Sequence, residues 1–459
     1  MSKPPDLRAE RKLDGYLVAM SKQLLLLELN EVNFESVAYY GSRGKLPELQ
    51  QLIERHGWHT TTSEQRYEYI EPWIQWVTAH TGLTLAEHGV LRLGDIVTKD
   101  LPQIWEMLEA RGLKVGAVSP MNAKHRLRRP AFFVPDPWTP TEVTGPKILK
   151  SLHRAVAQAV NDNAQARLSV ASLGALVSGM MRYARITNYS KYASLALGSA
   201  SAPWRRALLL DLLLADVFVN QVDATQPHFA SLFLNGGAHV QHHYMYSSES
   251  YRGPHRNPQW YAPRGADPVL EAYELYDRIY GTLRRRFPAA RIMVATGLHQ
   301  DPHGESTYYW RLKKHAEFLK KIGVEFVGVA PRMSRDFLVR CADRASAARA
   351  CDRLRLATAY DGAPLFDVDN RGDDLFVMLI YPREIGDDFV FRVGSDEYSD
   401  LHRDVAFVAL KNGEHNGTGY FLDTGAPKDS LPTEFPLSEI PERVMNALEL
   451  GKTLHDAAA

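Results

Sequence analysis

The stretch LLLLEL at residues 24–29, followed directly by Asn30 and Glu31, is the part of the sequence that best indicates the fold. Six residues with a single charge are typical of a strand that is buried on both faces, as the strands of a parallel sheet are. Similar runs recur as HFASLFLN (228–235) and ARIMVAT (290–296), and segments with helical periodicity separate them. Strands that alternate with helices predict an α/β fold, here a three-layer α/β/α sandwich around a mostly parallel central sheet.

Two long segments interrupt this alternation. Residues 126–227 begin with a proline-rich loop and continue with helical periodicity, which predicts a helical insertion. Residues 306–400 combine short strands with helices, which predicts a small α+β insertion. After it, DVAFVALKN (404–412) is expected to return to the main sheet. The α/β core is then predicted to consist of three segments, residues 20–125, 228–305 and 401–457.

The composition is that of an ordinary globular protein. Of the 459 residues, 45% are hydrophobic and 24% are charged, which excludes a largely disordered chain. Lys and Arg together number 54, as do Asp and Glu, so no net charge attracts nucleic acid and no nucleic-acid partner is expected. The two cysteines, Cys341 and Cys351, are too few for a disulfide framework and are predicted to be buried thiols in a reducing compartment.

The sequence contains no run with the length and apolarity of a membrane span, and the charged segment 1–15 lacks the apolar region of a signal peptide. We therefore predict a cytoplasmic protein. Residues 165–220 are rich in leucine, alanine and tyrosine with scattered arginines, a composition that is compatible with peripheral membrane contact. No pattern in the sequence predicts an oligomeric state.

Polar side chains gather directly after the predicted strands, at the edge where open parallel sheets bind ligands. Asn30 and Glu31 follow the first strand, Asn235 and His239 follow the second, and His299 follows the third. Imidazole nitrogen and carboxylate or amide oxygen are common ligands of divalent metals. Each residue singly also has a plainer interpretation, as a hydrogen-bonded polar group or as part of a turn. Their common position favours a metal site.

Four blocks of sequence follow one another in a characteristic order. Thr81–Gly89 matches a T-G-x-x-P-x-x-H-G signature except at the proline, and Asn235 and His239 have the spacing of D-x-x-G-H. Gly297–His299 is similar to the S-D-H-G that ends a strand, and Gly413–Gly419 matches G-x-H-x-x-x-G. This order resembles the alkaline phosphatase superfamily, and within it the type I phosphodiesterase/nucleotide pyrophosphatase and phosphoglycerate mutase-like members.

The resemblance implies an enzyme that acts on a phosphate-containing substrate, as a phosphoesterase, phosphodiesterase or phosphotransferase, with a divalent metal that is zinc, manganese or magnesium. It assigns four residues to the metal: Asn235, His239, His299 and His415. Neutral residues replace three of the family's anionic ligands, at Asn30, Asn235 and Leu298. Because carboxylates offset the repulsion between two neighbouring cations, their loss predicts one ion rather than two.

The family's Ser or Thr nucleophile, just before a proline, is replaced by Glu71, which precedes Pro72. We predict that Glu71, Glu31 and Asn30 are catalytic residues; the alternative for Glu71 is that it only caps the helix that begins there. The substrate is expected to contact four residues: Glu28, Trp73, His242 and His243.

Two alternative functions remain open. Carboxylates at Glu71, Glu28 and Glu31 suit general-base or nucleophilic work at a sugar carbon, so the chain is also interpreted as a glycosyl or nucleotide-sugar transferase on the same fold. The other alternative is a non-catalytic binding protein with a degenerate site, whose helical insertion is its interaction surface. An exposed apolar face on residues 165–220 would favour that alternative.

Overall fold

The fold is built around an eight-stranded sheet. Its strands are β1 (Leu24–Leu29), β2 (His59–Thr62), β3 (Val115–Val118), β4 (Phe132–Val134), β5 (Phe229–Leu234), β6 (Arg291–Ala295), β16 (Gly419–Asp423) and β17 (Glu434–Pro436), in the order β17-β2-β16-β6-β1-β5-β3-β4. Neighbouring strands are parallel, except that β16 runs antiparallel to β2 and β6. The predicted α/β fold with a mostly parallel central sheet is confirmed in this computed structural model, which describes residues 23–161, 169–332, 335–428 and 432–449.

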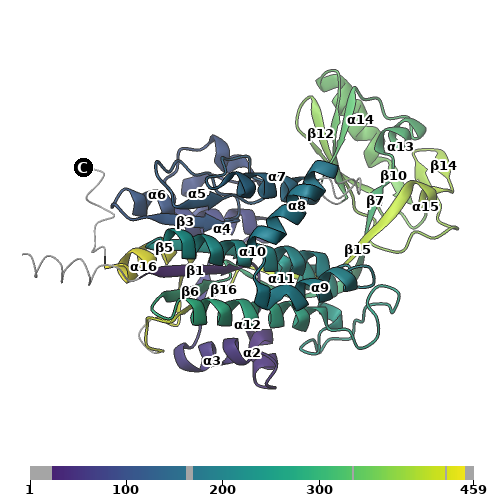
Figure 1. The fold of residues 1–459 in the computed structure, drawn as a ribbon. Helices are drawn as coiled ribbons and strands as arrows, with labels where there is room; N and C mark the ends of the chain where they lie inside the picture. Colours follow the sequence, from purple (N-terminus) through teal and green to yellow (C-terminus); the bar gives the residue numbers. More distant parts are fainter. Residues whose placement is uncertain (1–22, 162–168, 333–334, 429–431, 450–459) are drawn as a thin grey trace, which may run out of the picture.

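The central strand β1 is buried on both sides and separates two helical layers (Figure 1). Its residues Leu25 and Leu27 pack in one apolar core, and Leu24 and Leu26 pack in the other, as the two-residue period of a strand requires. On the first side lie α2 (Phe34–Gly41), α3 (Pro47–His56), α10 (Arg205–Thr225), α11 (Gly236–Tyr244) and α12 (Pro268–Arg286). On the second side lie α4 (Pro72–Thr81), α6 (Ile104–Glu109) and α16 (Ile440–Ala447), with α5 (Leu85–His88) following α4. These are the three layers of the sandwich.

The predicted helical insertion is present. Its helices are α7 (Lys147–Asn161), α8 (Val170–Tyr183), the short helix η3 (Ile186–Asn188) and α9 (Tyr189–Gly198), and they lead into α10. The proline-rich segment before them differs from the prediction, because Phe132 to Val134 form the edge strand β4 rather than a loop. Pro130 and Pro135 flank this apolar triplet, and prolines are tolerated at the ends of an edge strand. Among the described helices, none combines the length and apolarity needed to cross a bilayer.

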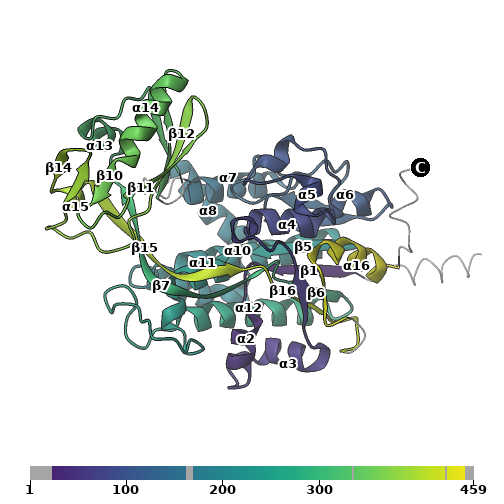
Figure 2. The ribbon, with the colours of Figure 1, turned by 180° about the vertical axis from the view of Figure 1, so that it is seen from behind.

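A second lobe is joined to the core by a long antiparallel ribbon of β7 (His299–Leu312) and β15 (Val405–Asn416), which Figure 2 shows running out of the core. The lobe contains the sheet β11-β12-β9-β8 and the sheet β10-β13-β14, which agrees with the predicted α+β insertion. Cys341 and Cys351 are buried and unpaired in it, as predicted. Its elements are α13 (His315–Lys321), β8 (Gly328–Pro331), β9 (Asp336–Arg340), α14 (Arg344–Arg355), β10 (Ala357–Ala359), β11 (Phe366–Asn370), β12 (Asp374–Leu379), β13 (Phe391–Val393), β14 (Asp396–Tyr398) and α15 (Leu401–Asp404).

One strand prediction is wrong. Residues 404–412 do not return to the main sheet but form most of β15, which pairs with β7. The reason is that Val405 and Phe407 pack against the apolar core of the second lobe. The strand that does return is β16, which is buried along its whole length between β2 and β6.

Candidate metal and catalytic site

Glu31 lies in the turn directly after the central strand and has a left-handed backbone conformation, with φ of 60°. This conformation costs a residue with a side chain about 1–2 kcal/mol, so the surroundings must hold it. The backbone N–H of Glu31 donates to the carbonyl of Thr296 at 3.1 Å, and its carbonyl accepts from Nε2 of Gln241 at 2.8 Å. The constrained turn places the buried carboxylate at the carboxyl edge of the sheet, between α11 and β15.

Two histidines meet this carboxylate. Oε2 of Glu31 lies 3.0 Å from Nε2 of His242 on α11 and 3.2 Å from Nε2 of His415 on β15, and the two nitrogens lie 3.2 Å apart. In a tetrahedral zinc site with ligand bonds of about 2.0–2.1 Å, neighbouring ligand atoms are separated by about 3.3 Å. The three atoms therefore fit one face of a tetrahedral site, with a fourth position left for water or substrate.

A second set of side chains fixes the orientation of the Glu31 carboxylate. Asn30 donates from Nδ2 to Oε1 of Glu31 at 2.8 Å, and Nε2 of Gln300 donates to Oε2. Asn30 is itself held by Trp76, whose Nε1 donates to Oδ1 at 2.7 Å, and its Nδ2 also donates to Asn235 at 2.8 Å. Asn30 is thus a fully bonded, buried residue that positions Glu31, and Asn235 reaches the cluster only through it.

His415 connects the cluster to Glu71. Its Nδ1 lies 3.6 Å from Oε2 of Glu71, and the ring also forms a hydrogen bond with the backbone of Ile70. A partner on Nδ1 directs Nε2 toward Glu31, which is the arrangement usually seen for metal-binding histidines. Burial by itself lowers the pKa of His415, but the charges of Glu31 and Glu71 reverse this and raise it. Burial would likewise raise the pKa of Glu31, yet His415 and His242 hold it well below its ordinary value.

Glu71 does not act as a helix cap. It precedes α4, but its side chain makes no capping hydrogen bond, and the carboxylate lies instead beside His415. Burial raises the pKa of Glu71 to about 7; Glu31 adds to the rise, while His415 and Lys411 oppose it. A carboxylate whose pKa lies near neutrality suits a general base.

Cations and aromatic rings surround Glu71 on its outer side. The charge of Lys411 acts on Glu71 and on Arg335, and the Arg335 guanidinium lies 4.1 Å from the ring centre of Tyr309. Burial lowers the pKa of both cations, although neighbouring acidic groups partly restore it. An open cavity of about 440 Å³ reaches His415 from solvent, and its lining includes Tyr67 and the acidic residues Glu64, Asp301 and Glu414. The site is therefore accessible through an acidic opening, while Lys411 contributes a positive charge near Glu71.

Neither the family models nor the curated proteins include a match to this chain. Solved structures that it is similar to include phosphonoacetate hydrolase from Sinorhizobium meliloti, at 14% identity over 93% of this chain and 96% of that chain, with a TM-score of 0.43. Human ectonucleotide pyrophosphatase/phosphodiesterase 5 is 10% identical over 95% and 97% of the two chains, with a TM-score of 0.45. Alkaline phosphatase PafA is 12% identical over 94% and 96%, with a TM-score of 0.44.

Three of the four residues that the resemblance assigned to a metal lie outside the cluster, namely Asn235, His239 and His299. Nδ1 of His299 is 2.5 Å from the carbonyl of Thr418 and its Nε2 is 3.2 Å from Oδ1 of Asp301, so both ring nitrogens have protein partners. His239 lies in the first half of α11 with an exposed side chain, and its ring centre is 5.0 Å from that of His243. The structure thus groups His415 with Glu31 and His242.

The other residues predicted to contact substrate have mixed positions. Glu28 pairs with His80 at 3.1 Å, deep in the core on the α4 side of the sheet. Trp73 is partly buried against the core between the sheet and α4, α6 and α16. His243 is next to the cluster but has its Nδ1 3.1 Å from the carbonyl of Leu410. His242, in contrast, is part of the cluster itself.

Four residues of the site do not follow from the sequence blocks: Gln241, Gln300, Arg335 and Lys411. The two glutamines are fully buried, and each directly adjoins a histidine of a strand-end segment. Their position next to these histidines was the sequence feature that could have identified them as site residues. Lys411 and Arg335 carried no such signal, because the ribbon and the second lobe bring them to the site from segments without a motif.

Proposed function

We propose that this chain is an enzyme that acts on a phosphate-containing substrate with one divalent cation, held by Glu31, His242 and His415. The observation that carries the proposal is the triangle of donor atoms, with sides of 3.0 to 3.2 Å. Two imidazoles and one carboxylate suit zinc or manganese better than magnesium, which prefers oxygen ligands.

The charge of the cluster supports both the number of ions and the class of substrate. A divalent cation beside one carboxylate and two neutral imidazoles leaves one net positive charge, which favours an anionic ligand. In the part of the chain that the structure describes, these three residues form the only group of histidine, cysteine and acidic side chains with ligand atoms within 4.8 Å of one another. A single ion is therefore the better-supported state.

The cation and the residues around the cluster have separate roles in the proposed reaction. When bound, the cation supplies Lewis-acid polarisation of the phosphoryl group. Lys411 and Arg335 bind other phosphate oxygens, because charged donors form the stronger hydrogen bonds to anions. Glu71 lies next to the cluster rather than in it, and takes the proton from the attacking water or alcohol.

A second candidate is a nucleotide-sugar transferase. It is supported by Glu71, a carboxylate with a pKa of about 7 in place of a hydroxyl nucleophile. Tyr67 and Tyr309 also support it, because their pKa values are raised by burial and by the charge of Glu71, which places them near it, and their rings can stack on a sugar or base. This function predicts that nucleotide sugars raise the melting temperature of the protein while simple phosphate esters are not hydrolysed.

Hydrolysis of p-nitrophenyl phosphate and bis(p-nitrophenyl) phosphate tests the first proposal. We expect turnover to require added zinc or manganese, and to be lost in His242→Ala and His415→Ala. His239→Ala is the matched control, since His239 lies on the same helix as His242 but outside the cluster. Turnover that survives chelation and both cluster variants would contradict the proposal.

A further inference from the structure

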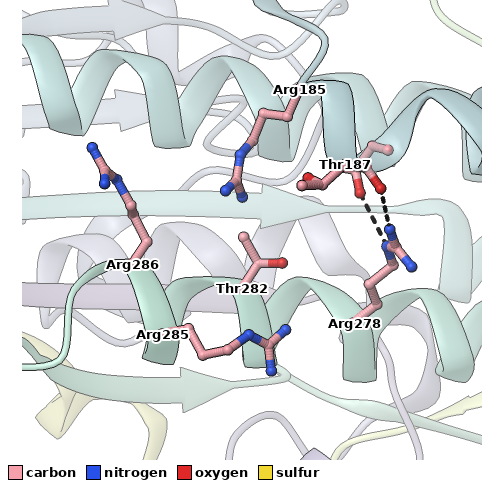
Figure 3. Close-up of a pocket in the computed structure, with 7 residues that line it drawn as sticks. Arg185, Thr187, Arg278, Thr282, Arg285 and Arg286 are labelled. Carbon is pink, nitrogen blue, oxygen red and sulfur yellow. Dashed lines mark hydrogen bonds between the residues drawn. The ribbon is translucent and has the colours of Figure 1, made fainter.

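A second polar cavity, of about 310 Å³, lies where η3 meets α12, away from the carboxyl edge of the sheet (Figure 3). Its size is that of a small-ligand site. Four arginines line it: Arg185, Arg278, Arg285 and Arg286. Thr187, Asn188 and Thr282 complete the lining, and no acidic residue takes part. We call this cavity the arginine pocket.

The charges of the arginine pocket are only partly compensated. Arg286 forms a bidentate pair with Asp223 at 2.9 Å, and Arg285 pairs with Glu48. Arg278 has neutral partners only: it donates to Oδ1 of Asn188 at 3.0 Å and to the carbonyl of Thr187 at 2.5 Å.

The side chain of Arg185 lies close enough to Asp216 for their charges to interact. Its backbone N–H donates to Asp216 at 2.8 Å, whereas among the described residues its guanidinium has no hydrogen-bonded partner, and Figure 3 shows it directed into the pocket. Guanidinium groups that line one cavity suit the several oxygens of a phosphate group, which they bind through paired hydrogen bonds.

Exposed apolar side chains occur beside the arginine pocket, at η3 and the start of α9, and on the helix α8 that precedes them. Ile186, which adjoins Arg185, is 79% exposed, and Tyr189 is 53% exposed. On α8, Val170 and Met181 are 89% and 74% exposed. The insertion therefore has the exposed apolar face that would favour an interaction surface. Apolar side chains mixed with cations are typical of surfaces that lie in the headgroup region of an anionic bilayer.

We propose that the arginine pocket binds the phosphate of an anionic phospholipid, while the exposed apolar residues of α8 and η3 enter the surface of the same membrane. The positive charge of the pocket supports a phosphate group as the ligand. The exposed apolar side chains support a phosphate that belongs to a lipid rather than to a free anion. The surface is independent of the metal cluster, so binding does not require turnover.

Co-sedimentation with vesicles tests this proposal. We expect the full chain to bind vesicles of phosphatidylcholine with phosphatidic acid, and not vesicles of phosphatidylcholine alone. Arg185→Gln should weaken binding about fivefold, the contribution of one basic residue near an anionic membrane. Arg284→Gln is the matched control, because Arg284 lies on the same helix but outside the pocket, paired with Glu48 and Gln51. It should leave binding unchanged.

Two further variants test the apolar part, since Ile186→Ser and Met181→Ser alter exposed side chains and should weaken vesicle binding without unfolding the protein. Equal losses for Arg185→Gln and Arg284→Gln would overturn a specific pocket. Calorimetric binding of inorganic phosphate that Arg185→Gln abolishes, without vesicle binding by the wild type, would assign the pocket to a soluble anion and overturn the membrane proposal. Absence of binding to either would overturn both.

Discussion

The cluster of Glu31, His242 and His415 and the arginine pocket differ in how their charges are compensated. In the cluster, a buried carboxylate faces two imidazoles and is further bonded by Asn30 and Gln300. In the arginine pocket, four guanidinium groups line one cavity, and carboxylates outside the lining pair with two of them. The first arrangement accepts one added cation in a fixed geometry, and the second attracts an anion. The comparison teaches that uncompensated charge and its burial, more than residue type, indicate what each site attracts.

The largest expected effect is at Glu31. Glu31→Gln keeps the size of the side chain but removes the charge that holds a cation between two histidines. We expect metal binding to disappear and any metal-dependent turnover to fall to background. Metal content and turnover after incubation with zinc measure this, and near-ultraviolet circular dichroism checks that the variant is folded. Full metal content in a folded Glu31→Gln protein would contradict the assignment of the cluster.

Glu71→Gln separates catalysis from metal binding. If Glu71 is the general base, turnover should fall by about 100-fold while metal content stays unchanged. Because the pKa of Glu71 is raised to about 7, activity should rise with pH through a limb at or below about pH 7. A bound cation favours the ionised carboxylate and moves the limb to lower pH. The limb should be absent in Glu71→Gln. A variant with unchanged turnover would show that Glu71 is not the base.

A substitution at Gln300 tests whether the hydrogen bonds that orient Glu31 contribute to metal affinity. Gln300→Met conserves volume but removes the hydrogen bond to Glu31. Loss of such a supporting bond typically weakens metal affinity by 10–100-fold, and we expect a decrease in that range. Titration with zinc in the presence of a competing chelator measures it. An unchanged affinity would mean that the histidines alone orient Glu31.

The smallest effect is expected at His299. Both of its ring nitrogens have protein partners, so His299→Ala should leave zinc affinity unchanged. The same titration as for Gln300 applies. A loss comparable to that of His415→Ala would show that His299 is a metal ligand after all, and that the ribbon rearranges when metal binds.

Most of the fold could be predicted from the sequence. The apolar runs at β1, β5 and β6 are continuous because these strands are buried on both faces, and the two insertions differ in periodicity from the core. One exception was strand β4, which lies in a segment predicted to be a loop. Another was the segment at 404–412, whose apolar residues are of strand type but belong to the core of the second lobe. Sequence pattern indicates that a residue is buried, and does not say in which of two cores.

The site could be predicted only in part. Its composition depends on the pairing register of the ribbon β7–β15 and on which face of α11 points toward Glu31. On the ribbon, His415 lies opposite Gln300 and Asn416 opposite His299. Since side chains alternate between faces along a strand, His415 and Gln300 face the cluster while His299 faces away. On α11, the helix phase directs His242 rather than His239 toward Glu31. Both choices depend on tertiary packing, which four separate sequence blocks do not contain.

The most direct test of the central claim is the metal content of the purified chain. After exposure to zinc or manganese and extensive dialysis, we predict one bound ion per wild-type chain, and none in His242→Ala or His415→Ala, while His239→Ala retains it. A wild-type protein that binds no metal, or variants of His242 and His415 that bind it as the wild type does, would contradict the account.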